Sequence, residues 1–253
     1  MNSFNGLLKK DLKLGLPFLY TSIIIVSLGL ITSIVLSSYY KTIMLVAIFA
    51  ITFCFAHVFY LPSFLLTSLN IEGKTQLWLH NPNSSIKLLL SKWITGILYS
   101  IISLFLMFSV AVISMYVGEL KLAFNQTNLF FMCLILLGIS IYLSSWVFFS
   151  WTLYHSMKKI VWLNKIRWVV LILLWNIWNI AVYWFNRIPV IDALKRKSVI
   201  SVDNTLAFEA RRDFFKASIE TTEISIFSLC GYILTLFFLF LIASWLLEKK
   251  VEV

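Results

Sequence analysis

Charged residues are scarce in this 253-residue chain, and long stretches contain none. Only 13% of the residues are charged, whereas a typical soluble domain has about 25%. No Lys, Arg, Asp or Glu interrupts the six apolar runs 16–36, 44–66, 93–117, 129–154, 168–185 and 224–247. The composition therefore excludes an ordinary soluble protein, and the runs offer no carboxylate for a proton relay.

Several functional motifs are also missing. The three cysteines, Cys54, Cys133 and Cys230, fall in separate apolar runs, so they predict neither a disulfide framework nor a ligand set. No two histidines stand at i, i+4, and no H-E-x-x-H occurs, so we expect no metal site. The chain lacks G-x-x-x-x-G-K-[ST], so we expect no bound nucleotide and no other cofactor on this chain.

What the sequence does contain is apolar runs of membrane-spanning length. A run of 21 residues such as 16–36 reaches about 31 Å as a helix and matches a hydrocarbon core of about 30 Å. Because backbone polar groups in lipid must be satisfied within the segment, we expect helices. The predicted fold is all-α, a single transmembrane domain over residues 1–253 with six spans, of which 168–185 is the shortest.

The net charge of +10 is explained better by membrane topology than by nucleic-acid binding, which we do not expect. If the N-terminus is cytoplasmic, the inner flanks and connections hold twelve Lys and Arg residues, and the two short outer connections hold only Lys41 and Lys121. The positive-inside rule then predicts a multi-pass protein with both termini in the cytoplasm.

Two polar segments are expected to form structure outside the spans. Phe4, Leu7, Leu8 and Leu12 share one face of a short N-terminal helix, which we expect to lie in the membrane interface before Gly15 and Pro17 turn the chain into the bilayer. A plain positive flank without a helix is the alternative. The outer loop 186–223 is predicted to form two amphipathic helices, the second from the spacing of small and aromatic residues over 207–217; an unfolded tether is the alternative.

The inner loop 67–92 contains an exposed apolar cluster. Thr75–His80 can form a short helix that ends at Asn81-Pro82, because the residue before proline disfavours the helical conformation. Leu77, Trp78 and Leu79 on such a helix suit a partner protein, or equally the headgroup layer.

The same loop carries a resemblance to a known family. Glu72-Gly73, Leu77-x-Leu79, Asn81-Pro82 and Lys92 opening the third span resemble the inner loop of type-2 ABC exporter permeases, although Asn83 stands where Ser or Thr is commoner. The six-span order resembles that family along the whole chain. Small permeases of Gram-positive peptide exporters, such as those of phenol-soluble modulins, are similar in length and layout.

The resemblance implies a partner ABC ATPase that holds ATP and Mg²⁺, and a second permease copy or paralogue in a bacterial plasma membrane. The coupling helix that would dock on the ATPase maps to the following residues: Glu72, Gly73, Lys74, Gln76, Leu77, Trp78, Leu79 and His80. The implied permease–permease interface involves the fifth span, where Trp175, Asn176, Trp178 and Asn179 concentrate aromatic and amide groups. Cargo would be an amphipathic peptide or a lipid-like molecule, because a surface of Phe and Leu need not desolvate a fixed charge.

His57 is the one ionisable side chain within a predicted span, and it is either packed and hydrogen-bonded or part of a cavity lining. The function favoured at this point is an export permease subunit that is not itself an enzyme. An ion-coupled secondary transporter is an alternative, but it usually needs an acid or a broken helix in the spans, and the sequence shows neither. A membrane-embedded immunity protein or enzyme is a third alternative, with no in-span base other than His57 to support catalysis.

Overall fold

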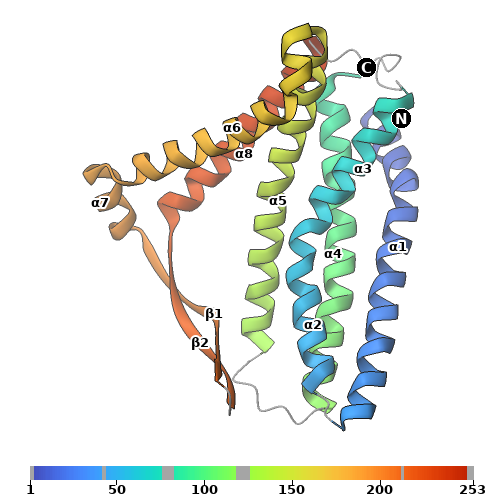
Figure 1. The fold of residues 1–253 in the computed structure, drawn as a ribbon, viewed down its shortest axis with the longest axis vertical. Coiled ribbons are helices and arrows are strands. Elements are labelled where there is room, and N and C mark those ends of the chain that lie inside the picture. Colours follow the sequence, from blue (N-terminus) through green and yellow to red (C-terminus); the bar gives the residue numbers. More distant parts are fainter. Residues whose placement is uncertain (1–2, 42–43, 76–82, 118–125, 212–213, 250–253) are drawn as a thin grey trace. The chain divides into compact units, whose positions relative to one another are not determined.

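The computed structural model describes residues 3–41, 44–75, 83–117, 126–211 and 214–249 (Figure 1). Six helices are long and apolar enough to cross a membrane, as predicted. The elements, in chain order, are α1 Ser3–Tyr40, α2 Met44–Ala56, a 3₁₀ turn His57–Phe59, α3 Tyr60–Thr75, α4 Ser85–Val117, α5 Gln126–Ser156, a 3₁₀ turn Met157–Lys159, α6 Val161–Asn186, α7 Pro189–Lys197, β1 Val199–Arg211, β2 Phe214–Ser225 and α8 Ile226–Lys249.

The chain divides into two compact units that alternate along the sequence. The first consists of Met1–Ser68, Leu90–Ile141 and Val202–Thr222, and the second of Leu69–Leu89, Tyr142–Ser201 and Glu223–Val253. Within the first unit, α1, α2 and α4 run side by side (Figure 1). A core of small and sulfur-containing side chains from α2, α4 and α5 fills its interior: Ala50, Cys54, Met107, Ala111, Met132 and Leu136. In the second unit, aromatic pairs join α5 to α6 and to α8.

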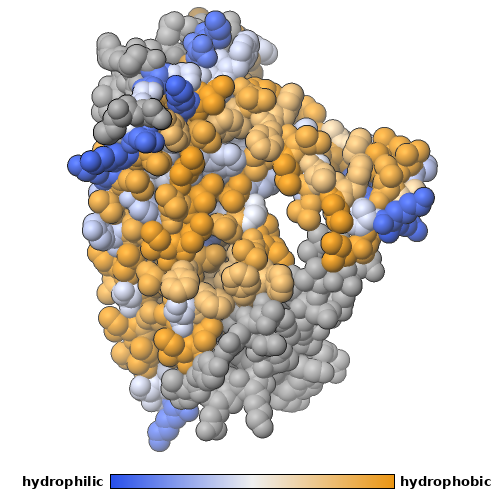
Figure 2. Space-filling view, turned by 180° about the vertical axis from the view of Figure 1, so that it is seen from behind, coloured by the Kyte–Doolittle hydropathy of each residue, from blue (hydrophilic) through white to orange (hydrophobic). Residues whose placement is uncertain are grey.

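The molecule has little polar surface along its spans. Large apolar side chains are exposed on each of the six membrane-length helices, and hydrophobic residues cover most of the described surface visible in Figure 2. Such a surface is compatible with a lipid environment, where apolar groups need no water contact.

The expected turn between an interfacial helix and the first span is wrong. α1 is one continuous helix from Ser3 to Tyr40, with Pro17 inside it. Gly15 does not bend the chain but allows a close approach, because a Cβ atom there would come within 2.5 Å of the Tyr99 ring and 2.9 Å of the Phe64 ring. The N-terminal segment therefore continues the helix of the first span and packs against these rings.

The second span is broken, which the sequence argument did not expect. α2 ends at Ala56, His57–Phe59 form a 3₁₀ turn, and α3 begins at Tyr60. Pro62 explains the break, because proline has no N–H to donate to the carbonyl of Val58 and its ring crowds that carbonyl. The interruption is local, since the backbone at Ala56 and Tyr60 on either side of it is helical and Ile48–Lys74 together form one helix of membrane-spanning length.

The loop between the fifth and sixth spans, which is predicted to lie on the outer side, is only partly helical. α7 lies where the first amphipathic helix was expected, but β1 and β2 form a two-stranded sheet in place of the second helix. The prediction of a helix over 207–217 was based mainly on the spacing of alanines, which are apolar but small. The same stretch alternates in period two, with Leu206, Phe208 and Ala210 separated by Ala207 and Glu209, and alternation is the strand pattern. The all-α description therefore holds for the membrane helices and not for this loop.

Candidate functional site

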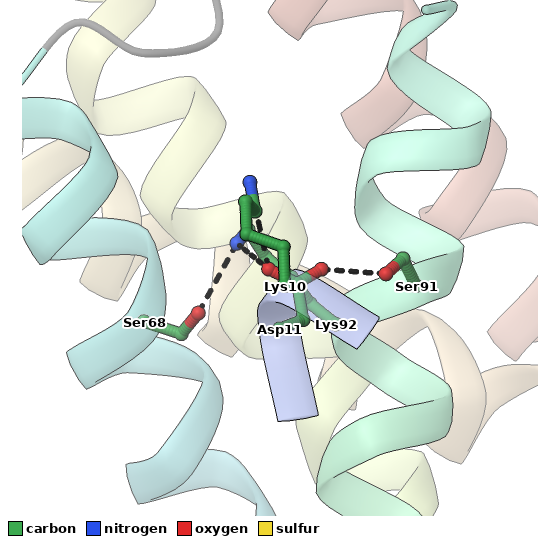
Figure 3. Close-up of polar contacts among 5 residues, drawn as sticks. All are labelled: Lys10, Asp11, Ser68, Ser91 and Lys92. Carbon is green, nitrogen blue, oxygen red and sulfur yellow. Dashed lines mark hydrogen bonds and ion pairs between the residues drawn. The ribbon is translucent and has the colours of Figure 1, made fainter. Parts of the chain in front are cut away.

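A buried ion pair connects the N-terminal part of α1 to α4. Lys92 Nζ lies 3.3 Å from Asp11 Oδ1, and the residues are only 1% and 3% exposed. Ser91 donates a 2.6 Å hydrogen bond to the other carboxylate oxygen, and the lysine also donates to Ser68 Oγ of α3 at 3.2 Å. Figure 3 shows these side chains converging from three helices, with Lys10 Nζ 3.6 Å from the same carboxylate.

The position of Asp11 on α1 explains its burial. Leu7, Asp11, Gly15 and Leu19 are the buried residues of the N-terminal half of α1, and they recur every four residues on one face. An acid on this face must be paired, because an unpaired buried charge is strongly unfavourable. Lys92 supplies the counter-charge from α4, and the two serines occupy further hydrogen-bonding positions.

A second contact between α1 and α4 involves Leu12, the residue after Asp11, and Tyr99, about two turns after Lys92. The Tyr99 hydroxyl donates to the backbone carbonyl of Leu12, and the ring of Tyr99 packs edge-on against Phe64 of α3. Together with Asp11 and Lys92, these contacts fix the N-terminal segment of α1 to α3 and α4.

The second unit has its own polar contacts at the ends of α3 and α4. Trp151 Nε1 of α5 donates to Asn70 Oδ1 near the end of α3 at 2.8 Å. Ser85, the first residue of α4, lies 2.8 Å from Ser244 Oγ and donates to Glu248 Oε2 at 3.2 Å, both on α8. The helices on either side of residues 76–84 are thus attached to α5 and α8.

These contacts join helices within each unit. Ser68 and Asn70 both belong to α3, and Ser85 and Lys92 both belong to α4. Among the described residues, no group of three or more His, Cys, Asp or Glu side chains could hold a metal ion.

The predicted coupling helix is only partly described. Glu72, Gly73 and Lys74 belong to the last turns of α3, with Glu72 only 2% exposed, Gly73 buried and Lys74 exposed. The segment that would form the predicted coupling helix follows them directly, and its placement on an ATPase stays a prediction. The remaining predicted residues, Gln76, Leu77, Trp78, Leu79 and His80, lie outside the described residues. α4 begins at Ser85, so Lys92 lies about two turns inside the helix and directly before the apolar run 93–117.

His57 lies at the break in the second span, and both of its ring nitrogens have partners. Nδ1 is 2.7 Å from the Phe53 carbonyl and Nε2 is 2.9 Å from Ser103 Oγ of α4. The ring stacks on Tyr60 at 5.8 Å and the residue is 7% exposed. His57 is not among the residues that line the described pocket. This geometry is that of a packed, hydrogen-bonded histidine.

In the fifth span, the aromatic and amide groups point to different neighbours. Trp175 and Trp178 of α6 pack against Trp146 of α5, with ring centroids 4.8 and 5.7 Å apart. The amides of Asn176 and Asn179 donate to carbonyls of their own helix at 2.8 and 2.7 Å, and both residues are exposed. Trp175 packs against Trp146 but remains 42% exposed, as Asn176 and Asn179 are exposed on the same helix. The permease–permease interface at these residues stays a prediction.

Sequence reasoning missed Asp11, Ser68 and Ser91, although one signal was present. Asp11 is three residues after Leu8 and four after Leu7, so it falls on the apolar face of the N-terminal helix. An acid on an apolar face predicts a buried partner. Nothing in the sequence indicates which lysine provides it, because residues 11 and 92 belong to different helices.

The comparisons with known proteins leave the family open. No family model matches the chain. The chain is similar to YhcE, an uncharacterized protein of Bacillus subtilis (strain 168), with 28% identity over 258 residues that cover both chains in full. No solved structure matches.

Proposed function

We propose that this chain is the transmembrane permease subunit of an ATP-driven exporter of the ABC type. It would move hydrophobic or amphipathic cargo, such as peptides, out of the cell. A separate ATPase subunit would hold ATP and Mg²⁺, and a second permease copy or paralogue would complete the pathway in a bacterial plasma membrane.

The observation that carries this proposal is the set of polar contacts around the helices that flank residues 76–84. Polar contacts between helices in lipid select partners more strongly than apolar packing, because lipid tails are as apolar as leucine. Here they join α1 to α3 and α4 through Asp11 and Lys92, and α8 to α4 through Ser85. A push on the connection between α3 and α4 would therefore move other helices as well.

Charge supports the orientation that this mechanism needs. Lys74 and Lys87 flank the connection, and Lys9, Lys10 and Lys13 lie on the N-terminal part of α1. By the positive-inside rule, these segments face the cytoplasm, which is where a soluble ATPase would act. ATP-driven closure of that partner would press on Leu77 and Trp78, and α3 and α4 would carry the motion into the membrane.

The test is co-purification of the full chain with its ATPase from native membranes. In a Leu77→Glu/Trp78→Glu variant, we expect loss of a co-purifying protein that contains a Walker A motif, because two charges would oppose an apolar contact. Val190→Glu is the matched control, since it adds a charge to an exposed apolar position of α7. Retention of the ATPase by the double variant would refute the docking role, and so would an absence of any Walker A protein in the wild-type sample.

The proposed permease–permease contact involves the exposed side of α6. Asn176 lies about 160° around the helix from Trp178, so the packed tryptophan leaves the amide side open. Cysteines introduced at Asn176 and Asn179 should crosslink between copies in a homodimer, whereas crosslinking only to a paralogue would indicate a heterodimer.

The break in the second span favours a second candidate, an ion-coupled secondary transporter. Transporters of that class often build their binding sites at discontinuous helices, and His57–Phe59 interrupt this span near its middle. Transport that stops on addition of an uncoupler while ATP is held constant would select this candidate. Transport that follows ATP and ignores the uncoupler would reject it.

A further inference from the structure

A pocket of about 390 Å³ lies within the second unit, between α5, α6, α7 and α8. Its volume falls in the range of small-molecule sites, about 300–1,000 Å³. The lining is mainly apolar and aromatic, and is formed by Tyr142, Trp178, Ala181, Val182, Phe185, Asn186, Lys195, Phe227, Ser228, Gly231, Tyr232, Leu234 and Thr235. None of these residues takes part in the polar contacts at the ends of α3 and α4 described above.

Among the described residues that line the pocket, Lys195 is the one with a charge. Its Nζ donates a 2.7 Å hydrogen bond to Asn186 Oδ1, a neutral group. The next residue of α7 differs, because Arg196 pairs with Asp192 at 2.8 Å. The contact with Asn186 orients Lys195 at the pocket without compensating its positive charge, and no described carboxylate forms an ion pair with it.

The charged and the apolar parts of the pocket lie at different positions along the spans. Lys195 and Asn186 lie where α6 ends, whereas Trp178 and Thr235 lie within α6 and α8. Eight residues of helix from 178 to 186 correspond to about 12 Å. The pocket thus extends from a cation at the end of the spans into an apolar region at the depth of the lipid tails.

The neighbouring surface indicates what fills the pocket. α6 has no buried residues, and its large side chains, including Ile177, Ile180 and Tyr183, are exposed. In a membrane this helix is surrounded by lipid unless a partner covers it. A lipid molecule can therefore reach the pocket sideways, with its headgroup at the level of Lys195.

We propose that the pocket binds an anionic membrane phospholipid, with an acyl chain among the α6 and α8 side chains and the headgroup phosphate at Lys195. Two features select this ligand, namely the apolar lining at tail depth and the cation at headgroup depth. The proposal goes beyond the permease function, because binding requires neither the ATPase nor a cargo.

The pocket can be tested by replacing Gly231 with a larger residue that fills it. A Cβ atom added at Gly231 meets nothing within 4 Å, so a larger side chain enters open space. Ala181 lies on the opposite wall, on α6, and Ala181→Leu fills the pocket independently of α8. Gly138 is the matched control, because a Cβ there also meets nothing within 4 Å and the residue does not line the pocket.

The experiment measures lipid binding to the full chain, delipidated in detergent, by native mass spectrometry. Phosphatidylglycerol and phosphatidylcholine with the same acyl chains are added separately. We expect the wild-type chain to bind one phosphatidylglycerol about fivefold more tightly than phosphatidylcholine, from the attraction of one lysine to an anionic headgroup. Gly231→Leu and Ala181→Leu should lose this bound lipid, and Gly138→Leu should keep it.

Two charge variants test the headgroup position. Lys195→Gln should abolish the preference for phosphatidylglycerol while leaving phosphatidylcholine binding unchanged. Lys197→Gln, which removes a charge from the same helix outside the pocket lining, should keep the preference. Both are surface changes that leave the helices intact, so they report on binding even if a filled pocket impairs folding.

Three results would overturn the proposal. Lipid binding that survives both Gly231→Leu and Ala181→Leu would show annular lipid elsewhere on the surface. A preference for phosphatidylglycerol that survives Lys195→Gln would remove the headgroup from this site. Binding of an anionic amphipathic peptide that requires Lys195 and Gly231, with no lipid bound under any condition, would assign the pocket to a peptide.

Discussion

Replacing Asp11 with leucine is the sharpest test of the contacts that hold α1 in place. The substitution removes the carboxylate that lies 3.3 Å from the buried Lys92 ammonium. At an effective dielectric constant of about 20, two unit charges 3.3 Å apart attract by about 5 kcal/mol. Removal of one partner of a buried pair typically costs about 3–5 kcal/mol, so Asp11→Leu should destabilise the protein by an amount in that range.

The measurement is thermal unfolding of the full chain in detergent, followed by circular dichroism at one fixed scan rate. For a chain of about this size, 1 kcal/mol corresponds to roughly 2–4 °C, so Asp11→Leu should lower the midpoint by about 10 °C. The double variant Asp11→Leu/Lys92→Met should recover most of the loss, because an apolar pair of similar volume can replace a buried ion pair at little cost.

An exposed pair within the same chain supplies the control. Asp192 and Arg196 lie 2.8 Å apart on the surface of α7, and exposed pairs contribute about 0–1 kcal/mol. Asp192→Asn should therefore change the midpoint by no more than a few degrees. The reasoning fails if Asp11→Leu is as stable as the wild type, or if the double variant is no more stable than Asp11→Leu alone.

Three smaller perturbations test the packing of the first unit. Gly15→Ala should destabilise the protein by about 1–3 kcal/mol through overpacking against two aromatic rings, whereas Gly6→Ala meets open space and should be neutral in the same thermal assay. Ser103→Ala should cost about 1–3 kcal/mol by leaving Nε2 of the buried His57 without its partner, while Nδ1 keeps the Phe53 carbonyl; Ser109→Ala, at a serine that donates to a carbonyl of its own helix, is the control, and equal midpoints would contradict the assigned contact. Pro62→Ala supplies the missing backbone N–H and should slow amide hydrogen exchange around the break in the second span; unchanged exchange would show that the proline is not its cause.

The number of membrane helices could be predicted from the sequence because lipid imposes a length and a composition on each span. The ends of those helices could not, since a helix can continue beyond the apolar core. α1 has 38 residues, about 57 Å of helix, whereas the hydrocarbon core is about 30 Å thick. Its N-terminal part is fixed by protein contacts at Asp11 and Gly15, and these depend on residues 64, 91, 92 and 99.

The structure differs from the prediction at the second span and at the loop between the fifth and sixth spans, for different reasons. Pro62 was visible in the sequence and could have predicted the break, because a proline inside a helical run leaves a carbonyl without its partner. The strands β1 and β2 were harder to predict, because outside the membrane neither lipid nor a large core selects between period two and period 3.6. The β-branched residues of 199–225, such as Val202, Thr205 and Ile219, favour strand, and pairing with a neighbouring strand decides the outcome.

The distribution of polar contacts indicates which helices move as one body. In lipid, helices with only apolar contacts can exchange neighbours at little cost, whereas separating buried polar partners leaves each of them unsatisfied. α1, α3 and α4 share the contacts of Asp11 and Lys92 and should therefore move together. α6 has its asparagine amides bonded to its own backbone, so its exposed side can approach and leave a partner without breaking a bond to its own chain. A permease that rearranges during transport needs both kinds of helix, one fixed to the segment that receives the force and one free to change its contacts.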